Sequence, residues 1–104
     1  MKIAISATGD SVNSKTDPRF GRAPFFAIYD SDKGETLFVE NRAADMREGA
    51  GPVAVRLIAE HSVSRVVSGE FGAKVKPLLK QLHIEMVAND NPENRVIDII
   101  NSYK

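Results

Sequence analysis

The sequence predicts an α/β fold, built on a five-stranded mixed sheet that is flanked by three helices. The first observation is the order of the apolar patterns, in which three strand-like runs are followed by alternating helical and strand-like segments. The second is that a hairpin gives antiparallel strands, whereas each later helical crossover gives a parallel pair. The third is length, because 104 residues without cysteine predict one domain, residues 1–104. A domain of that size buries roughly 65% of its unfolded surface without disulfides.

The first three predicted strands follow from short apolar runs separated by polar residues. Residues 3–6 form a buried first strand, and a long polar loop occupies residues 7–24. Residues 25–30 form the second strand. Residues 31–34, with serine, aspartate and glycine, have the composition of a tight turn, and residues 36–40 return as the third strand.

The first helix is expected to begin near Gly51-Pro52, because proline is well tolerated in a first helical turn. One face of this helix is expected to bury four side chains, those of Ala54, Leu57, Ile58 and His61. The next apolar run, residues 63–68, is continuous enough to lie inside a sheet as the fourth strand.

The second and third helices are predicted from apolar residues at helical spacing. In the second helix the spacing i, i+3, i+4, i+7 is met by Val75, Leu78, Leu79 and Leu82. Pro77 falls in or near its first turn, and residues 84–88 form the last strand. Asn91-Pro92 is interpreted as the N-cap and first residue of the third helix. That helix is expected to bury Val96, Ile99, Ile100 and Tyr103.

This order predicts where a ligand would bind. Four strands end at one edge of the sheet, here called the carboxyl edge, where the second strand begins. The loops 7–24 and 41–50, the turns 69–72 and 89–91, and all three helix N-termini are expected there. Open α/β sheets bind ligands outside the carboxyl ends of their strands, and helix N-termini favour anions. The loops also carry five cations, Lys15, Arg19, Arg22, Arg42 and Arg47, so the sequence predicts an anion-binding edge.

The segment 17–24, DPRFGRAP, is the most informative part of the chain. Arg19 and Arg22 offer planar guanidinium donors that suit oxyanions, and Gly21 permits a close backbone approach. The alternative interpretation is a surface turn whose Phe20 fills the core and whose arginines are solvated. The segment alone does not decide between the two, since irregular packing and function both concentrate in loops.

Composition and motifs exclude several function classes. Lys and Arg together number 14, as do Asp and Glu, so no global basic field indicates nucleic acid or an anionic membrane. The absence of cysteine excludes thiolate catalysis and cysteine-based metal motifs. No signal peptide or membrane-spanning run is recognisable, which predicts a cytoplasmic protein. No Walker loop, GxGxxG or Ser–His–Asp arrangement is present, so we expect no enzymatic activity.

Four segments in their order resemble the dinitrogenase iron-molybdenum cofactor biosynthesis family, small proteins related to NifX and to the C-terminal domain of NifB. The segments are MKIAI, DPRFGRAPFFAIYD, GAGP and the strand end SGEFG. The resemblance covers nearly the whole chain. It implies a ribonuclease H-like fold with strand order 3-2-1-4-5 and an antiparallel second strand. It also implies non-covalent, non-catalytic binding or carrying of an iron–molybdenum cofactor precursor or a related molybdenum-containing metal–sulfur cluster.

The candidate cofactor-binding residues lie in three segments of the carboxyl edge, and they are Arg19, Phe20, Gly21, Arg22, Glu48, Gly49, Gly51, Gly69 and Gly72. Met46 is a weak candidate for a thioether metal ligand, with packing as the alternative. Family members commonly place a histidine where this chain has Glu48, and some carry a cysteine near the position of Ala23. A carboxylate in place of the histidine would repel an anionic cluster. His61 and His83 are expected at the opposite edge, as partners of helix C-termini.

Two functions remain open from the sequence. The first is a carrier that holds an anionic cluster through Arg19, Arg22 and backbone amides, with a protein partner in cluster delivery. The second is a protein-interaction module of the same fold that has lost the metal site. Nuclease activity is not expected, because the first strand, residues 3–6, has no metal-binding carboxylate. The chain is expected to be a monomer or a weak homodimer, with the free edges of the third and fifth strands as contact surfaces.

Overall fold

The predicted order of strands and helices is confirmed. The computed structural model describes residues 1–104. Its elements are β1 (Lys2–Ala7), β2 (Phe25–Asp30), β3 (Glu35–Glu40), α1 (Ala50–Ala59), β4 (Arg65–Ser68), α2 (Val75–Gln81), β5 (Glu85–Ala88) and α3 (Val96–Asn101). The sheet has the order β3-β2-β1-β4-β5. Strand β2 is antiparallel to both of its neighbours, whereas β1, β4 and β5 are parallel.

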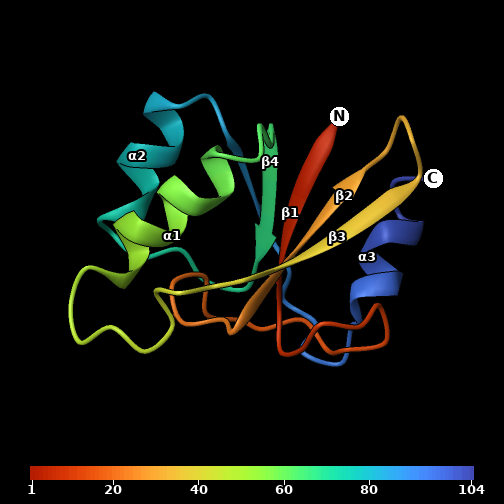
Figure 1. Ribbon diagram of the computed structural model, residues 1–104, viewed down its shortest axis with the longest axis horizontal. Coiled ribbons are helices and arrows are strands. Elements are labelled where there is room, and N and C mark those ends of the chain that lie inside the picture. Colours follow the sequence, from red (N-terminus) through yellow and green to blue (C-terminus); the bar gives the residue numbers. More distant parts are fainter.

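Helices cover both faces of the sheet. Helices α1 and α2 lie together on one face, and α3 lies on the other (Figure 1). Side chains alternate along β1, so that Ala4 joins the cluster under α1 and α2 while Ile3 and Ile5 join the cluster under α3. Because both faces are covered, the inner strands need apolar residues at nearly every position. None of the three helices is long and apolar enough to cross a membrane.

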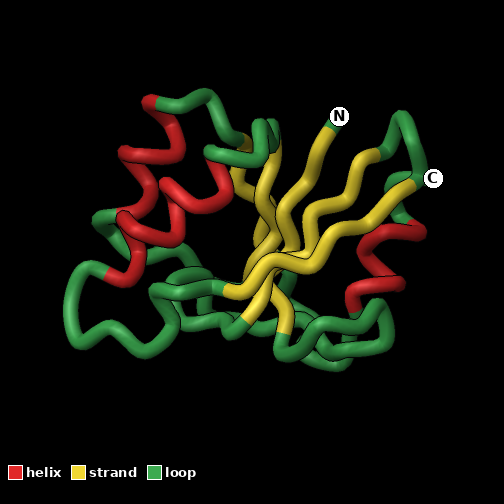
Figure 2. The backbone as a smooth tube through the Cα atoms, in the orientation of Figure 1, coloured by secondary structure: helices red, strands yellow, loops and turns green.

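The long connections gather at the carboxyl edge, as the element order predicts. The β1–β2 loop, the β3–α1 loop and the β4–α2 loop lie along the lower side of the sheet in Figure 2. Strand β1 ends there at Ala7, opposite the first residue of β2, Phe25. The opposite edge carries the short β2–β3 turn, where Gly34 adopts a positive φ of 69°.

The start of the third helix was predicted wrongly. Residues Asn91-Pro92 lie in a turn, and α3 begins only at Val96. The N-cap is Arg95, whose backbone N–H donates to the carboxylate of Asp98 at 2.8 Å. Arg95 is extended and forms a β-bridge with Lys15. The β1–β2 loop therefore holds this part of the chain out of the helix, a tertiary constraint that outweighs the local Asn-Pro signal.

Three predicted core positions also differ. Tyr103 is only half-buried, because α3 ends at Asn101. Helix α1 ends at Ala59, so His61 is only half-buried in the turn that follows it. Leu82 is 49% exposed, because α2 ends at Gln81 and the side chain lies beyond the face that packs on the sheet. Val75 and Leu79 are buried as predicted.

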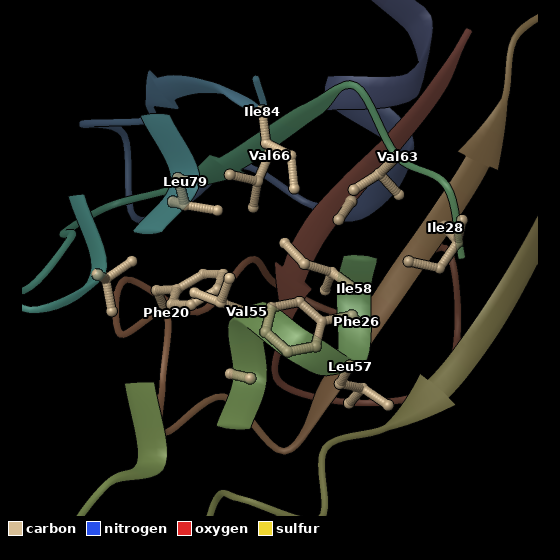
Figure 3. Packing of buried hydrophobic residues seen from close by; sticks show 13 residues of the cluster. Phe20, Phe26, Ile28, Val55, Leu57, Ile58, Val63, Val66, Leu79 and Ile84 are labelled. Carbon is tan, nitrogen blue, oxygen red and sulfur yellow. The ribbon is translucent and has the colours of Figure 1, made fainter. Parts of the chain in front are cut away.

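Replacement of Leu79 tests this packing. Its side chain is fully buried between α2 and the sheet (Figure 3). We expect Leu79→Ala to lower the free energy of unfolding by about 2–5 kcal/mol, since it removes buried methyl groups and leaves a cavity. Chemical denaturation measures this change. The matched control is Leu82→Ala, an exposed leucine directly after the end of α2, for which a loss below about 1 kcal/mol is expected. Equal losses for the two variants would contradict the packing.

Candidate functional site

The β1–β2 loop is fastened to the two central strands by buried hydroxyls. Ser6, at the end of β1, donates from Oγ to the carbonyl oxygen of Asp17 at 2.6 Å. Ser68, at the end of β4, donates from Oγ to the carbonyl oxygen of Pro18 at 3.4 Å. The two hydroxyl oxygens lie 2.9 Å apart. These serines, which carry no catalytic arrangement, fix where the segment 17–24 leaves the sheet.

Gly69 permits the close passage of this loop over the end of β4. A Cβ at Gly69 would lie 2.7 Å from the Cα of Pro18, closer than real side chains approach. The neighbouring Glu70 N–H donates to the Pro18 carbonyl at 2.7 Å. The glycine predicted as a ligand contact is therefore required first for backbone packing.

Gly21 and Gly51 bring three segments of the chain together. A Cβ at Gly21 would lie 3.1 Å from the backbone nitrogen of Gly51, in the first turn of α1. A Cβ at Gly51 would in turn lie 2.6 Å from Cγ2 of Val75, the first residue of α2. The β1–β2 loop and the starts of α1 and α2 therefore meet at the carboxyl edge.

Arg19 is paired within its own loop. Its Nε donates to Oδ1 of Asp17 at 3.1 Å, and its Nη2 donates to Oδ2 at 3.0 Å. The Asp17 side chain is 3% exposed and that of Arg19 is 60% exposed. Hydrogen bonding to the carboxylate, together with its charge, raises the pKa of Arg19. The charge of Arg19, one of the two arginines predicted to bind an anion, is thus balanced by the carboxylate of Asp17.

Arg22 holds the β3–α1 loop. Its guanidinium donates from Nη1 to the carbonyl oxygens of Ala44, at 3.3 Å, and Met46, and from Nη2 to that of Arg47 at 3.2 Å. Three backbone carbonyls thus use the donors that the sequence suggested for an anion. Arg22 is half-buried and lies at the rim of the site.

Asn41, which was not predicted as a site residue, is the first residue of the β3–α1 loop and joins it to the β1–β2 loop. This residue is 3% exposed, and its Nδ2 donates to the carbonyl oxygens of Gly21, at 3.1 Å, and Ala23, at 2.8 Å. Its Oδ1 accepts from the N–H of Ala43 at 3.1 Å. A lone asparagine directly after an apolar strand was the only signal for it in the sequence.

Phe20 points into the core, as the alternative interpretation of the segment 17–24 predicted. Its side chain is 2% exposed, and its ring centroid lies 5.4 Å from that of Phe26 and 5.8 Å from that of Phe71. Figure 3 shows Phe20 directed into the cluster that α1 and α2 cover. Phe20 therefore anchors the loop and does not line an open surface.

Five of the nine predicted residues meet in one groove, here called the glycine groove. Its volume is about 390 Å³. The groove is lined by Gly21 and Arg22, by residues 49–52 at the start of α1, and by residues 72–75 at the start of α2. Gly49, Gly51 and Gly72 thus lie together with Gly21 and Arg22 of the β1–β2 loop. Glu48 is exposed and precedes Gly49, the N-cap of α1, whereas Gly69 lies in a separate depression beside Pro18.

The chemistry of the glycine groove comes mainly from the backbone. The N–H groups of Ala50, Gly51, Ala73 and Lys74 donate to no acceptor in the protein. Neither α1 nor α2 has an acidic residue in its first turn or a side-chain cap. The ammonium of Lys74 forms no ion pair. These donors, with the positive end of α1, suit an anion.

The other predicted cations and metal ligands lie outside this groove. Lys15 pairs with Glu93 at 3.0 Å, and Arg42 pairs with Glu60 at 3.7 Å. Met46 is half-buried, and its Cε lies 4.0 Å from the position of a Cβ on Gly49. No group of three or more His, Cys, Asp or Glu side chains is arranged to hold a metal ion.

A family of known proteins matches this chain over its whole length. The family is described as dinitrogenase iron-molybdenum cofactor, and the match covers residues 1–104. The chain belongs to this family. The resemblance in DPRFGRAPFFAIYD, GAGP and SGEFG is thereby confirmed, and these segments supply most of the lining of the glycine groove.

The chain is also similar to individual proteins and solved structures. An uncharacterised protein from Methanocaldococcus jannaschii is 32% identical over 89 residues, which are 83% of this chain and 72% of that protein. The apo form of the orange protein from Desulfovibrio gigas superposes with a TM-score of 0.91 at 27% identity. A Thermotoga protein described as NifB-like and as a member of the DUF35 family gives 0.83 at 27% identity. Both structural matches cover 98% of this chain and 85% of the other.

Sequence reasoning missed Ala73 and Lys74, which contribute free N–H groups and the only unpaired lysine of the groove. A signal was present, since the GEFG turn leads directly into the second amphipathic stretch. The residues between such a turn and its helix supply the N–H groups that lack helical partners.

The close approach at Gly69 generates a stability prediction. We expect Gly69→Ala to lower the free energy of unfolding by about 1–3 kcal/mol, because the new methyl group would overlap Pro18. The control is Gly72→Ala in the same loop, where a Cβ would meet nothing within 4 Å and where φ is not positive. That variant should be nearly neutral. Urea titration of both proteins measures the difference, and a neutral Gly69→Ala would refute the packing role.

Proposed function

We propose that this protein binds and carries an iron–molybdenum cofactor precursor, or a related anionic molybdenum-containing metal–sulfur cluster, in the glycine groove. Binding is non-covalent and no reaction is catalysed. The observation that carries the proposal is the set of four backbone N–H groups without acceptors at the starts of α1 and α2. Membership of the dinitrogenase iron-molybdenum cofactor family supports the choice of cargo. The apo description of the orange protein supports a ligand-binding role for this fold.

Backbone amides replace the arginines as the main ligand contacts in this proposal. Arg19 is paired with Asp17, and the donors of Arg22 are used by the carbonyls of the β3–α1 loop. The N–H groups of Ala50 and Gly51 donate to sulfur or oxygen atoms of the cluster, and Lys74 adds one exposed positive charge. Arg22 contributes by holding the wall of the groove and by its long-range charge.

Glu48 weakens this attraction. Its carboxylate is exposed directly before the N-cap of α1, where it opposes the positive end of the helix for any approaching anion. Family resemblance implies a histidine at this position, so the chain combines an anion-binding backbone with a repulsive side chain. Weak, salt-sensitive binding follows.

Titration with tetrathiomolybdate under anaerobic conditions tests the contribution of charge. We expect saturable binding that weakens as salt rises, because exposed charges are screened within about 8–10 Å at physiological ionic strength. Lys74→Ala should raise the dissociation constant about three- to tenfold, which is about 0.7–1.4 kcal/mol. The matched control is Lys33→Ala, since Lys33 is exposed in the β2–β3 turn at the opposite edge. Equal effects of the two variants would contradict a groove at the helix starts.

Replacement of Glu48 tests the electrostatic opposition. We expect Glu48→Gln to strengthen tetrathiomolybdate binding by removing a negative charge, and Glu48→His to strengthen it further by adding an imidazole. Absorption spectra and calorimetry on the same samples give affinity and stoichiometry. If neither the parent nor Glu48→His shows saturable binding, the carrier function is wrong and the interaction module replaces it.

A further inference from the structure

A second surface lies next to the glycine groove, at the free edge of the sheet. Strand β5 is the last strand, with β4 on one side and nothing on the other. The N–H groups of Glu85 and Asn89 donate toward β4, to Ser64 at 3.0 Å and Ser68 at 2.8 Å. Because backbone groups alternate in direction along a strand, those of Met86 and Ala88 point to the open side. This edge can therefore accept another strand.

An open groove of about 580 Å³ runs between this edge and α2. Its apolar part comes from Phe71, Pro77 and Met86, with Ala88 at the strand end. Phe71 and Met86 are only half-buried, so the protein itself leaves apolar surface beside the unpaired backbone. The groove thus offers contacts to both the backbone and the side chains of an added strand.

The charge of this groove selects its occupant. Lys76 and Lys80 line it from α2, one helical turn apart, and both are exposed. Neither forms an ion pair in the protein. The one carboxylate of β5, that of Glu85, bridges to Arg65 at 2.9 Å, and Arg65 lies over the ring of Tyr103 on the α3 side of the sheet. A second copy is disfavoured, because antiparallel pairing of β5 with itself would bring the lysines of both grooves together.

We infer that the β5–α2 groove binds an extended acidic segment of a partner protein. The segment adds to the sheet beside β5 and exchanges hydrogen bonds with the N–H and C=O groups of Met86 and Ala88, a recognised mode of peptide binding. Alternate side chains of the segment face α2, where carboxylates meet Lys76 and Lys80. Strand β5 has four residues, so the paired stretch is short and the charges add specificity.

The probe for this inference is a capped eight-residue peptide that alternates glutamate with valine. Titration of the full ¹⁵N-labelled chain should shift the amide signals of Met86, Ala88, Lys76 and Lys80 saturably. The double variant Lys76→Glu/Lys80→Glu should weaken binding at least tenfold, whereas Lys33→Glu, at the opposite edge, should not change it. A peptide with lysine for glutamate tests charge, and one N-methylated at alternate residues tests strand pairing.

Several outcomes would overturn the inference. These are no saturable shift up to millimolar peptide, equal binding of the lysine peptide, equal binding of the N-methylated peptide, or shifts that map elsewhere. Concentration-dependent self-association through β5, detected by sedimentation, would assign the edge to a second copy instead. The inference does not rest on the cluster function. The peptide titration is made without tetrathiomolybdate and the tetrathiomolybdate titration without peptide, so failure of one proposal leaves the other standing.

Discussion

The site depends on the seating of one loop against the sheet at distances that only glycine permits. Residues 17–24 reach the start of α1 and the end of β4 because Gly21, Gly51 and Gly69 present no Cβ to the atoms opposite them. Buried hydroxyls of Ser6 and Ser68 supply the hydrogen bonds that fix the loop there. A larger side chain at any of the three glycines would force these segments apart, and the glycine groove is formed by their meeting.

This packing explains why Arg19 and Arg22 donate hydrogen bonds to groups of the protein itself. The carboxylate of Asp17 and the backbone carbonyls of the β3–α1 loop need hydrogen-bond partners, and Arg19 and Arg22 provide them. The amides at the helix starts are then held in fixed positions without the entropic cost of ordering long side chains. Binding through amides favours a range of anions of suitable size, whereas a guanidinium fork favours planar oxyanions.

Much of the fold could be predicted, because periodicity and the hairpin-then-crossover order leave few alternatives. The start of α3 could not be predicted, since it depends on a β-bridge between Lys15 and Arg95. These two residues are 80 positions apart in the chain. For the site, the topology placed the glycine segments together correctly. The partners of Arg22 are backbone carbonyls whose positions depend on the path of the β3–α1 loop. Asp17, two residues before Arg19, was a local signal for the ion pair.

The two surfaces are joined by packing. The loop between β4 and α2 lines both, since Phe71 belongs to the β5–α2 groove and Gly72 to the glycine groove. Phe71 also contacts Phe20, which anchors the β1–β2 loop in the core, with ring centroids 5.8 Å apart. A strand added at β5 covers Phe71 and so restricts the residue that supports one wall of the other groove. Any coupling that results is reciprocal, because an occupant that changes affinity at one groove is affected equally by binding at the other.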